Sequence, residues 1–484
     1  DTAPEALDAV LAAASAAAGP LAALRPARRA TLLRAAADAL DAAAGDLMPV
    51  AMRESSLPEQ RLTGEVARSS GQLRLFADAL EEGSYLEAVI DTADPDAAPV
   101  PRPDLRRMLV PLGPVLVFAA SNFPFAFSVP GGDTASALAA GAPVVLKAHP
   151  GHPELSRRTG EVLAEALCAA GAPEGTFAVV HGTDTGTAAL TDPRIKAAAF
   201  TGSVSGGRAL MDIAASRPEP IPFYGELGSL NPVFVTPAAV AARGDAIADG
   251  YVASFTLGTG QFCTKPGLLF LPEGHGLEER LTDAVRATAS AGMLADRIRA
   301  GHAEERDRLA GLGAVRTLVR GGDDAAGVAP TLLATTAGEL LADPGALLTE
   351  CFGPTSLVVE YAGTDELHAA AETFGGTLTA TVHAEESDDV APLLERLRDR
   401  TGRILFNGWP TGVAVAAAMH HGGPWPATTA SVHTSVGTTA VRRFLRPICY
   451  QNAPQSLLPE ALADRNTLGL PRRIDGTLTT EDVT

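Results

Sequence analysis

The sequence predicts an α/β fold with parallel sheets that carry helices on both faces. Between residues 107 and 228, short apolar runs typical of buried strands alternate with helical patterns. A second alternating region extends from about residue 231 to residue 440. Strand–helix–strand alternation favours parallel pairing, because each helix returns the chain to the same end of the sheet. Ligands of such sheets bind at the carboxyl ends of the strands, so a site is expected there.

Helices are expected over roughly the first 80 residues. Two apolar stripes at helical spacing predict packing faces: Leu33, Leu40 and Leu47, and then Leu62, Val66, Leu73, Phe76 and Leu80. Residues 85–103 are rich in Pro and Asp and begin with a short strand-like run, so they are expected to form an arm.

The alternation itself is visible in short segments. Strands are expected in MLVPLGPVLVFAAS, PVVLKAH, FAVVHG and AAAFTGS. Helices are expected in GGDTASALAAG and in ELSRRTGEVLAEALCAAG, which Gly171 ends, and another begins at Ser203. The polar residues Asn122 and Lys147, and the glycine Gly202, each follow strand material.

The composition limits the class of protein. The chain has 484 residues, of which 46% are hydrophobic and 20% are charged, as in ordinary globular proteins. Its formal net charge of −19 would repel nucleic acid and anionic lipid, so we expect neither as a partner. No apolar run is expected to reach transmembrane length, and the acidic start lacks the basic residues of a signal peptide. We expect a cytoplasmic protein. The sequence begins with Asp1 and not with Met, so we also expect that the true beginning is missing.

Cys263 is the strongest candidate for a catalytic residue. It lies in GQFCTKPG, where the flanking glycines allow a sharp turn with free backbone amides. Such amides lower the pKa of a thiol and can hold an oxyanion, so we expect a thiolate nucleophile. The alternative is a buried, inert cysteine. The four cysteines are scattered singly, which predicts neither a disulfide framework nor a zinc site.

Two further side chains are candidates for acid–base and oxyanion chemistry. Glu226 ends an apolar strand in YGELGSLNP, where burial would raise its pKa towards that of a general base. An ordinary loop carboxylate is the alternative. Asn122 follows a strand in SNFPFAF, and its amide suits an oxyanion hole, although an Asx turn would use the same residue.

Three segments are candidates for dinucleotide binding. Gly202 and Ser203 in FTGSVSGG form a strand–turn–helix start that suits a phosphate, although many such turns bind none. Lys147 ends a strand in VVLKAHP and could bind a ribose or its phosphate, or be an ordinary solvated lysine. Glu350 and Phe352 in ECFGP could bind a ribose and brace a nicotinamide ring, or be a loop acid beside a core aromatic.

These segments occur in the order found in the aldehyde dehydrogenase superfamily, which the chain resembles over nearly its whole length. The resemblance covers the Asn-Phe-Pro strand end, the strand-end Lys, the Phe-Thr-Gly-Ser turn, the Glu-Leu-Gly segment, the nucleophile loop and the Glu-x-Phe-Gly-Pro loop. Within the superfamily, SNFPFAFSVPGGDTASALAAG, KAHPGHP, GQFCTKPG and TSVGTTAVRRFLRPICYQ resemble the branch of α-ketoglutaric semialdehyde dehydrogenases and NADP-linked fatty aldehyde dehydrogenases.

The resemblance implies an architecture. We expect a Rossmann-type cofactor domain (residues 1–84 and 107–228) and a second α/β catalytic domain (229–440). A β oligomerisation arm and tail (85–106 and 441–484) would pair with another subunit in a homodimer or homotetramer. Superfamily members usually open with a β-hairpin, which this sequence does not include.

The resemblance also implies a mechanism. Cys263 would attack an aldehyde, its backbone N–H and the Asn122 amide would stabilise the oxyanion, and a hydride would pass to a nicotinamide. Glu226 would deprotonate the water that hydrolyses the thioester. Members that transfer the acyl group to coenzyme A typically lack this base, so a carboxylic acid product is implied. No metal is expected.

The remaining roles concern the cofactor. By resemblance, Lys147 and Glu350 would hold the two riboses, Gly202 and Ser203 would lie at the pyrophosphate, and Phe352 at the nicotinamide. NAD-preferring relatives often place a Glu three positions after the strand-end Lys, where this chain has Pro150. No carboxylate there repels a 2′-phosphate, and His149 with Lys147 could attract one, so we expect NADP to be preferred, with NAD possible.

The substrate is less closely defined. α-Ketoglutaric semialdehyde (2,5-dioxopentanoate) is one expectation, but the branch would place an Asp near Ala430 and an Arg near Val432, and this chain has neither. Arg442 and Arg443 are basic, but nothing in the sequence places them in a pocket. A fatty or aromatic aldehyde is therefore the alternative. A thiol esterase without redox chemistry and a non-catalytic protein on the same fold are competing hypotheses.

Overall fold

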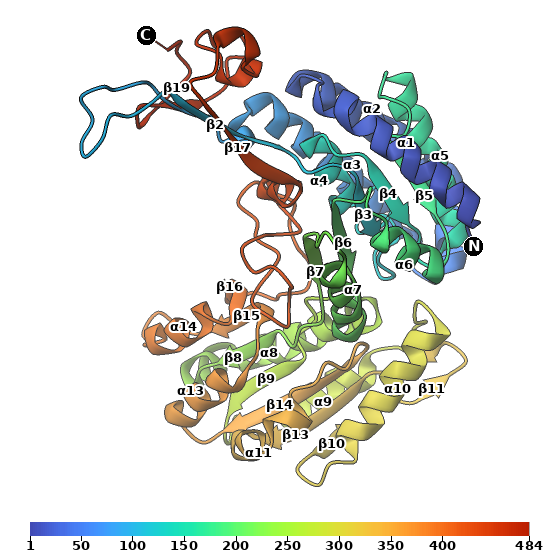
Figure 1. The fold of residues 1–484 in the computed structure, drawn as a ribbon. Helices are drawn as coiled ribbons and strands as arrows, with labels where there is room; N and C mark the ends of the chain where they lie inside the picture. Colours follow the sequence, from blue (N-terminus) through green and yellow to red (C-terminus); the bar gives the residue numbers. More distant parts are fainter. Residues whose placement is uncertain (484) are drawn as a thin grey trace.

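The computed structural model describes residues 1–483. Its strands form a five-stranded sheet beside the N-terminal helices, a seven-stranded sheet in a second lobe, a five-stranded sheet in a projecting arm, and a small hairpin (Figure 1). The hairpin consists of β11 (Asp323–Asp324) and β12 (Gly327–Val328). The predicted α/β fold is confirmed.

The first residues of the chain form helices, as predicted, and the structure shows three: α1 (Pro4–Ala22), α2 (Pro26–Ser55) and α3 (Glu59–Glu82). Both apolar stripes of α2 and α3 are buried and form packing faces. By length and composition alone, α1 could cross a membrane, with a mean hydropathy of 1.2. In the structure, Leu7 and Leu11 of α1 pack in the same core cluster as strand residues of the first sheet.

The first sheet is parallel throughout, in the order β5-β4-β3-β6-β7. Its strands are β3 (Val115–Phe118), β4 (Val144–Lys147), β5 (Phe177–Val180), β6 (Ala197–Thr201) and β7 (Phe223–Glu226). Its helices are α4 (Gly132–Ala140), α5 (Pro153–Ala169), α6 (Thr183–Thr191) and α7 (Val204–Ser216). The strands lie where the apolar runs predicted them, and α7 begins directly after Ser203.

The register of the first sheet aligns the carboxyl ends of its strands. Phe118 is paired with Lys147 on one side and with Phe200 on the other, and Thr201 is paired with Glu226. The polar segments that follow these strands therefore share one edge of the sheet, as Brändén's rule requires.

The second sheet has the order β10-β13-β14-β9-β8-β15-β16, and only β10 runs antiparallel to its neighbour. Its strands are β8 (Pro232–Val235), β9 (Leu268–Pro272), β10 (Arg316–Val319), β13 (Thr331–Thr336), β14 (Thr355–Tyr361), β15 (Thr377–His383) and β16 (Thr401–Phe406). Its helices are α8 (Pro237–Thr256), α9 (Glu278–Ala287), α10 (Asp296–Ala310), α11 (Ala337–Ala342), α12 (Pro344–Leu347), α13 (Thr364–Thr373) and α14 (Ala391–Arg398).

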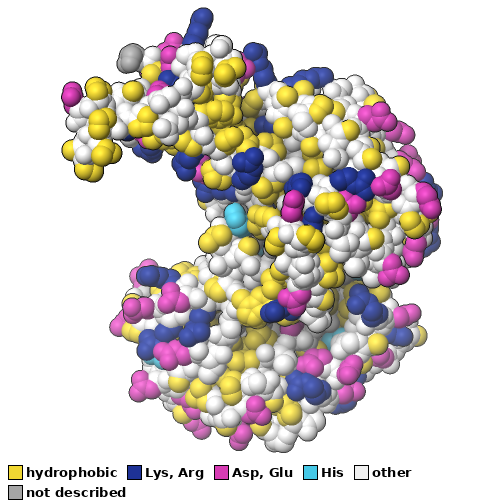
Figure 2. Space-filling model, in the orientation of Figure 1, with side chains coloured by type: hydrophobic (Ala, Val, Ile, Leu, Met, Phe, Trp, Pro, Cys, Tyr) yellow, Lys and Arg dark blue, Asp and Glu magenta, His cyan; other side chains and the backbone are white. Residues whose placement is uncertain are grey.

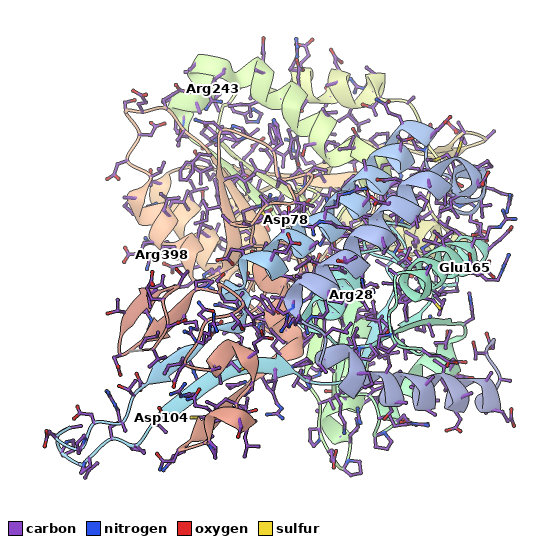
Figure 3. The ribbon with its side chains drawn as sticks, turned by 90° about the horizontal axis from the view of Figure 1, so that it is seen from above. Arg28, Asp78, Asp104, Glu165, Arg243 and Arg398 are labelled. Carbon is purple, nitrogen blue, oxygen red and sulfur yellow. The ribbon has the colours of Figure 1, made fainter. Side chains whose placement is uncertain are left out.

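The arm joins segments from two distant parts of the chain. Its order is β17-β2-β1-β18-β19, with β1 (Val89–Asp91), β2 (Leu105–Pro111), β17 (Leu445–Gln451), β18 (Arg472–Ile474) and β19 (Thr477–Thr479). Figure 2 shows a hollow between the arm and the lobe of the second sheet. In the view from above (Figure 3), α2 and α3, with Arg28 and Asp78 labelled, cross the middle of the molecule, and the arm near Asp104 projects to one side.

Candidate active site

Three side chains from distant parts of the chain meet at the carboxyl edge of the first sheet. Glu226 is the last residue of β7, Cys263 lies in the loop after α8, and His421 comes from the irregular segment that follows β16. Cys263 Sγ lies 3.4 Å from His421 Nε2, and the same nitrogen lies 2.7 Å from Glu226 Oε1. The structure thus brings together the predicted nucleophile and base through a histidine that the sequence did not single out.

Glu226 is almost fully buried and its carboxylate has two protein partners. The ring of His421 contacts one oxygen, and the Ser435 hydroxyl donates to the other. Burial is the largest influence and alone would raise the pKa of Glu226. The attraction of His421 and the hydrogen bonds from His421 and Ser435 outweigh it, so this pKa is lowered from its ordinary value. The expectation of a raised pKa for Glu226 is therefore wrong, because it took account of burial but not of these two partners.

The Cys263 thiol has a pKa well above its ordinary value. Burial is the main cause, and the negative charge of Glu226 adds to it. The expected lowered pKa is therefore wrong: flanking glycines do not outweigh desolvation and a carboxylate. Arg68 opposes the shift, because its positive charge favours the thiolate. In this state Cys263 is a thiol, and it would need a base to ionise before it could act as a nucleophile.

The sharp turn before Cys263 depends on an unusual backbone conformation. Gly258, Thr259 and Gly260 have φ values of +56°, +56° and +65°, in the left-handed region that favours glycine. A Cβ on Gly260 would overlap the carbonyl of Gly353, so this position needs glycine for space as well. Here the loop passes close to the segment that follows Glu350 and Phe352.

Two buried polar side chains fasten this loop to the second sheet. Asn231 Nδ2 donates to the carbonyl oxygens of Cys263 (2.7 Å) and Lys265 (2.9 Å). Lys265 Nζ donates to the carbonyl oxygens of Cys351 (2.5 Å), Gly353 (3.2 Å) and Thr355 (2.8 Å). Burial lowers the pKa of Lys265. These bonds fix the nucleophile loop relative to the loop with Glu350 and Phe352.

Asn122 lies beside the nucleophile loop, as an oxyanion hole requires. Its Nδ2 donates to the Gln261 carbonyl oxygen at 3.1 Å, which leaves the second amide hydrogen for another acceptor. Within residues 1–483, the backbone N–H of Cys263 donates no hydrogen bond. An amide hydrogen and a backbone N–H near the nucleophile are the two donors that acyl-transfer sites use for a developing oxyanion.

The predicted dinucleotide residues lie along the same edge of the sheet. Gly202 donates its N–H to the Glu226 carbonyl oxygen at 3.0 Å, and the Ser203 hydroxyl caps α7 by accepting from Gly206 N–H at 3.2 Å. Lys147 is half-buried at the end of β4. The exposed start of α7 and this lysine are groups that fit the phosphates and a ribose of a dinucleotide.

His149 does not carry the charge that was expected of it. Burial, with the positive charges of His152, Lys147 and Arg297, lowers the pKa of His149 to about 3. Its Nδ1 accepts from the Gly151 N–H at 3.0 Å. At neutral pH it is therefore a neutral hydrogen-bonding group. Arg297 of α10 lies near enough to Lys147 to lower its pKa as well, although burial of Lys147 is the larger cause.

Glu350 is turned towards the start of α7. A Cβ on Gly228 would overlap the Glu350 carboxylate, and a cavity there is lined by Val204, Gly228, Ser229 and Glu350. Burial raises the pKa of Glu350 to about 7. Phe352 is half-buried two residues further on. Glu350 and Ser203 thus border the same end of α7, although they are distant in sequence.

Sequence reasoning missed His421, Ser435 and a charged face of α3. The two former residues lie in a segment without helix or strand, where no periodicity marks them. Arg61, Glu65 and Arg68 lie on the same helix as the apolar stripe, and the stripe alone was interpreted as a packing face. Their spacing of four and three residues places them on one helix face, which was the available signal.

Comparison with known proteins identifies the family of the chain. A family model described as the aldehyde dehydrogenase family matches residues 1–427. The α-ketoglutaric semialdehyde dehydrogenase 2 of Azospirillum brasilense is 48% identical over 464 residues, which is 93% of this chain and 87% of the relative. The α-ketoglutaric semialdehyde dehydrogenase of Acinetobacter baylyi is 45% identical and aligns with 90% of this chain and 84% of its own length.

The solved structures agree on the fold. The γ-glutamyl-γ-aminobutyraldehyde dehydrogenase of Burkholderia cenocepacia superposes with a TM-score of 0.80 at 23% identity, over 94% of this chain and 90% of that protein. Fold, motif order and family match all point the same way: the chain belongs to the aldehyde dehydrogenase family.

Proposed function

We propose that this enzyme oxidises a short semialdehyde to a carboxylic acid by a hydrolytic route, with Cys263 as the nucleophile. The observation that supports this most is the compact trio of Cys263, His421 and Glu226. The cysteine sulfur, a ring nitrogen of the histidine and a carboxylate oxygen lie within 4.8 Å of one another. In this proposal, the trio supplies both a nucleophile and the base that must activate it, next to the loop that Asn122 contacts.

Glu226 first removes the proton of the thiol. Its lowered pKa keeps it ionised at neutral pH, and His421 keeps the carboxylate in place. The thiolate adds to the aldehyde carbon, and the oxygen of the adduct is held by the Asn122 amide and the Cys263 N–H. When bound, an oxidised nicotinamide dinucleotide would be the oxidant that accepts the hydride of the adduct. Loss of that hydride leaves a thioester on Cys263.

The second half of the reaction regenerates the thiol. Glu226, after losing its proton to solvent, deprotonates a water that adds to the thioester carbon. The sulfur leaves, takes up a proton, and the carboxylic acid is released. A base within contact distance of the nucleophile favours water as the acyl acceptor over coenzyme A, which supports the non-acylating assignment.

We propose the cofactor residues by the same reasoning. Lys147 and Glu350 would hold the riboses, Gly202 and Ser203 the pyrophosphate, and Phe352 the nicotinamide ring. The preference for NADP rests on Pro150, which offers no carboxylate to repel a 2′-phosphate, and on the positive charges of Lys147 and Arg297. His149 would contribute a hydrogen bond.

The proposed substrate is 2,5-dioxopentanoate, the semialdehyde of α-ketoglutarate. It is supported by the two relatives at 48% and 45% identity, which are named for that activity. An Arg at position 432 would not serve this substrate within one chain, because Val432 is 84% exposed. Its absence therefore does not favour a fatty or aromatic aldehyde.

Unpaired sheet edges support a homodimer or homotetramer. The outer strands β17 and β19 of the arm, and β16 of the second sheet, each have a partner on one side only within residues 1–483. Leu478 of β19 and Phe406 of β16 are exposed by 64% and 55%. Exposed strand edges are normally covered, and a second copy of the chain would cover them. A cytoplasmic location also remains a proposal.

A panel of aldehydes tests these proposals together. Initial rates of nicotinamide reduction would be measured with 2,5-dioxopentanoate, pentanal, dodecanal and benzaldehyde, each with NADP and with NAD. We expect 2,5-dioxopentanoate with NADP to give the highest kcat/KM and α-ketoglutarate as the product without coenzyme A. A higher kcat/KM for dodecanal, or a requirement for coenzyme A, would contradict the proposal.

A further inference from the structure

The inner face of helix α3 carries charged side chains next to the nucleophile. Arg61, Glu65 and Arg68 follow one another at four and three residues, and Arg61 Nε lies 3.2 Å from Glu65 Oε1. Both arginines lie close enough to the Cys263 thiol to interact with its charge. Aldehyde oxidation as described above uses neither guanidinium as an acid, base or oxyanion donor, so their presence needs another explanation.

Arg68 is largely buried and only partly satisfied. Its Nη1 donates to the Val413 carbonyl oxygen at 2.9 Å, whereas its Nε and Nη2 have no partner within residues 1–483. The guanidinium lies over the ring of Phe127 at 5.3 Å from the centroid. Burial lowers the pKa of Arg68, and the negative groups around it only partly compensate. A buried guanidinium with two free donors is the group that binds a carboxylate in bidentate fashion.

Two more arginines surround the same place. Arg61 Nη2 donates to the Asn122 carbonyl oxygen at 2.8 Å, and its Nη1 is without a partner among the described residues. Arg403 of β16 donates through Nη2 to the carbonyl oxygens of Pro410 (3.0 Å) and Gly412 (3.2 Å), and its buried Nε is likewise free within residues 1–483. Arg403 also lies close enough to Cys263 for a negative charge on the sulfur to raise the pKa of the guanidinium, although burial lowers this pKa overall.

The local charges leave room for one more anion. Glu65 faces Arg61, but burial raises the pKa of Glu65 to about 7, so it neutralises less than one positive charge. Glu226 already has His421 as its partner. Three buried guanidinium groups are therefore balanced by less than two carboxylates. Arg442 and Arg443 are not part of this set, because they pair with Glu87 and Asp133.

An apolar wall lies against these arginines: the Arg61 guanidinium lies over the rings of Phe123 and Phe262, and that of Arg68 over Phe127. Phe123, Phe127 and Phe262 pack in one cluster, and Val413 and Val415 pack against it. Such a wall suits the carbon chain of a substrate whose aldehyde end reaches the sulfur and whose other end reaches the charges.

We propose that Arg68, assisted by Arg61 and Arg403, binds the carboxylate of a short oxo-carboxylate substrate while its aldehyde carbon lies at Cys263. This inference rests on the proposed function and adds the residues that select the substrate. The selectivity for a carboxylated aldehyde over an uncharged one of equal length thus resides mainly on α3, and not on the segment around residue 432.

The test compares two substrates in one variant. For Arg68→Met, we expect the kcat/KM for 2,5-dioxopentanoate to fall about 100-fold more than the kcat/KM for pentanal, and the KM to account for most of the difference. Any effect of Arg68 on the thiol itself would lower both values equally and leave their ratio unchanged. Arg403→Met should change the ratio in the same direction by a smaller factor.

Arg74→Met is the matched control, because Arg74 lies on the same helix but is a surface residue paired with Asp38 and Asp41. It should keep the wild-type ratio. Melting temperature and dinucleotide binding report folding, and Arg68→Lys keeps the charge if Arg68→Met does not fold. An unchanged ratio in the Arg68 and Arg403 variants of a carboxylate-selective enzyme overturns the subsite alone. A wild-type enzyme that prefers pentanal overturns the proposed substrate and the subsite together.

Discussion

The contact between His421 and Glu226 gives the sharpest prediction about the chemistry. Replacing His421 by Leu removes the ring that lies 2.7 Å from Glu226 Oε1 but keeps a side chain of moderate size. The carboxylate then remains buried and still accepts the hydrogen bond from the Ser435 hydroxyl. Burial, the largest influence on Glu226, would be opposed less strongly, so the pKa of Glu226 should rise.

The size of the effect follows from the lost hydrogen bond. A hydrogen bond to a charged group contributes about 1.5–3 kcal/mol. At 1.36 kcal/mol per pKa unit this corresponds to a rise of about one to two units. Glu226 must be deprotonated to act as a base, so activity is lost as the pH falls through its pKa. The acid limb of the kcat–pH profile should therefore move to higher pH by about one to two units.

The assay is the kcat–pH profile, measured by nicotinamide reduction under saturating substrate and cofactor. His420→Leu is the matched control, since it changes the neighbouring histidine, which does not contact Glu226. Melting curves and dinucleotide binding at each pH separate loss of fold from loss of the base. If the His421→Leu profile superimposes on those of the wild type and the control, His421 does not set the proton affinity of Glu226.

Three further results are expected. The pKa of Glu65 is about 7 in the folded protein, against an ordinary value of 4.5. Between these two pH values the folded state keeps a proton that the unfolded state releases. The free energy of unfolding of the wild type is therefore higher at acid pH, and this contribution is lost as the pH rises towards 7. Chemical denaturation should therefore show that the free energy of unfolding of Glu65→Gln rises by about 3 kcal/mol relative to that of the wild type between pH values below 4.5 and above 7. An equal dependence of the two unfolding free energies on pH would contradict this. Lys265→Met leaves three buried carbonyls without their donor and should lower the free energy of unfolding by about 3 kcal/mol or more and raise the KM for the dinucleotide; unchanged values of both would show that Lys265 does not fix the two loops. Pro150→Glu should shift the kcat/KM ratio towards NAD at least tenfold, and a ratio that stays constant would argue against a 2′-phosphate near this position.

Much of the fold was predictable because strand ends have a local signature. Apolar runs followed by Asn122, Lys147 and Gly202 identified the strands of the first sheet, and the parallel register brings these ends to one edge. Cys263 and Glu226 could be singled out as candidates because each lies in a short and distinctive glycine-bracketed segment. The α3 stripe predicted a packing face correctly, since its apolar residues are buried.

The properties that the sequence did not predict depend on contacts between distant residues. The pKa of Cys263 depends on burial by the folded lobes and on Glu226, which is 37 positions away, and neither is visible in GQFCTKPG. His421 lies in an irregular segment whose path is set by tertiary packing. Arg68 has an ordinary sequence context, and only the structure shows two of its donors without a partner.

The central claim is that Cys263 carries the acyl group. Because Glu226 serves both halves of the reaction, the intermediate is trapped in the wild-type enzyme: rapid acid quenching during turnover with aldehyde and NADP stops hydrolysis of the thioester. Mass spectrometry of the digested protein should then find the acyl mass on the peptide that contains Cys263, in an amount that depends on the cofactor. The exposed Cys168 and Cys449 serve as internal controls. An adduct on either of these, with none on Cys263, would contradict the account.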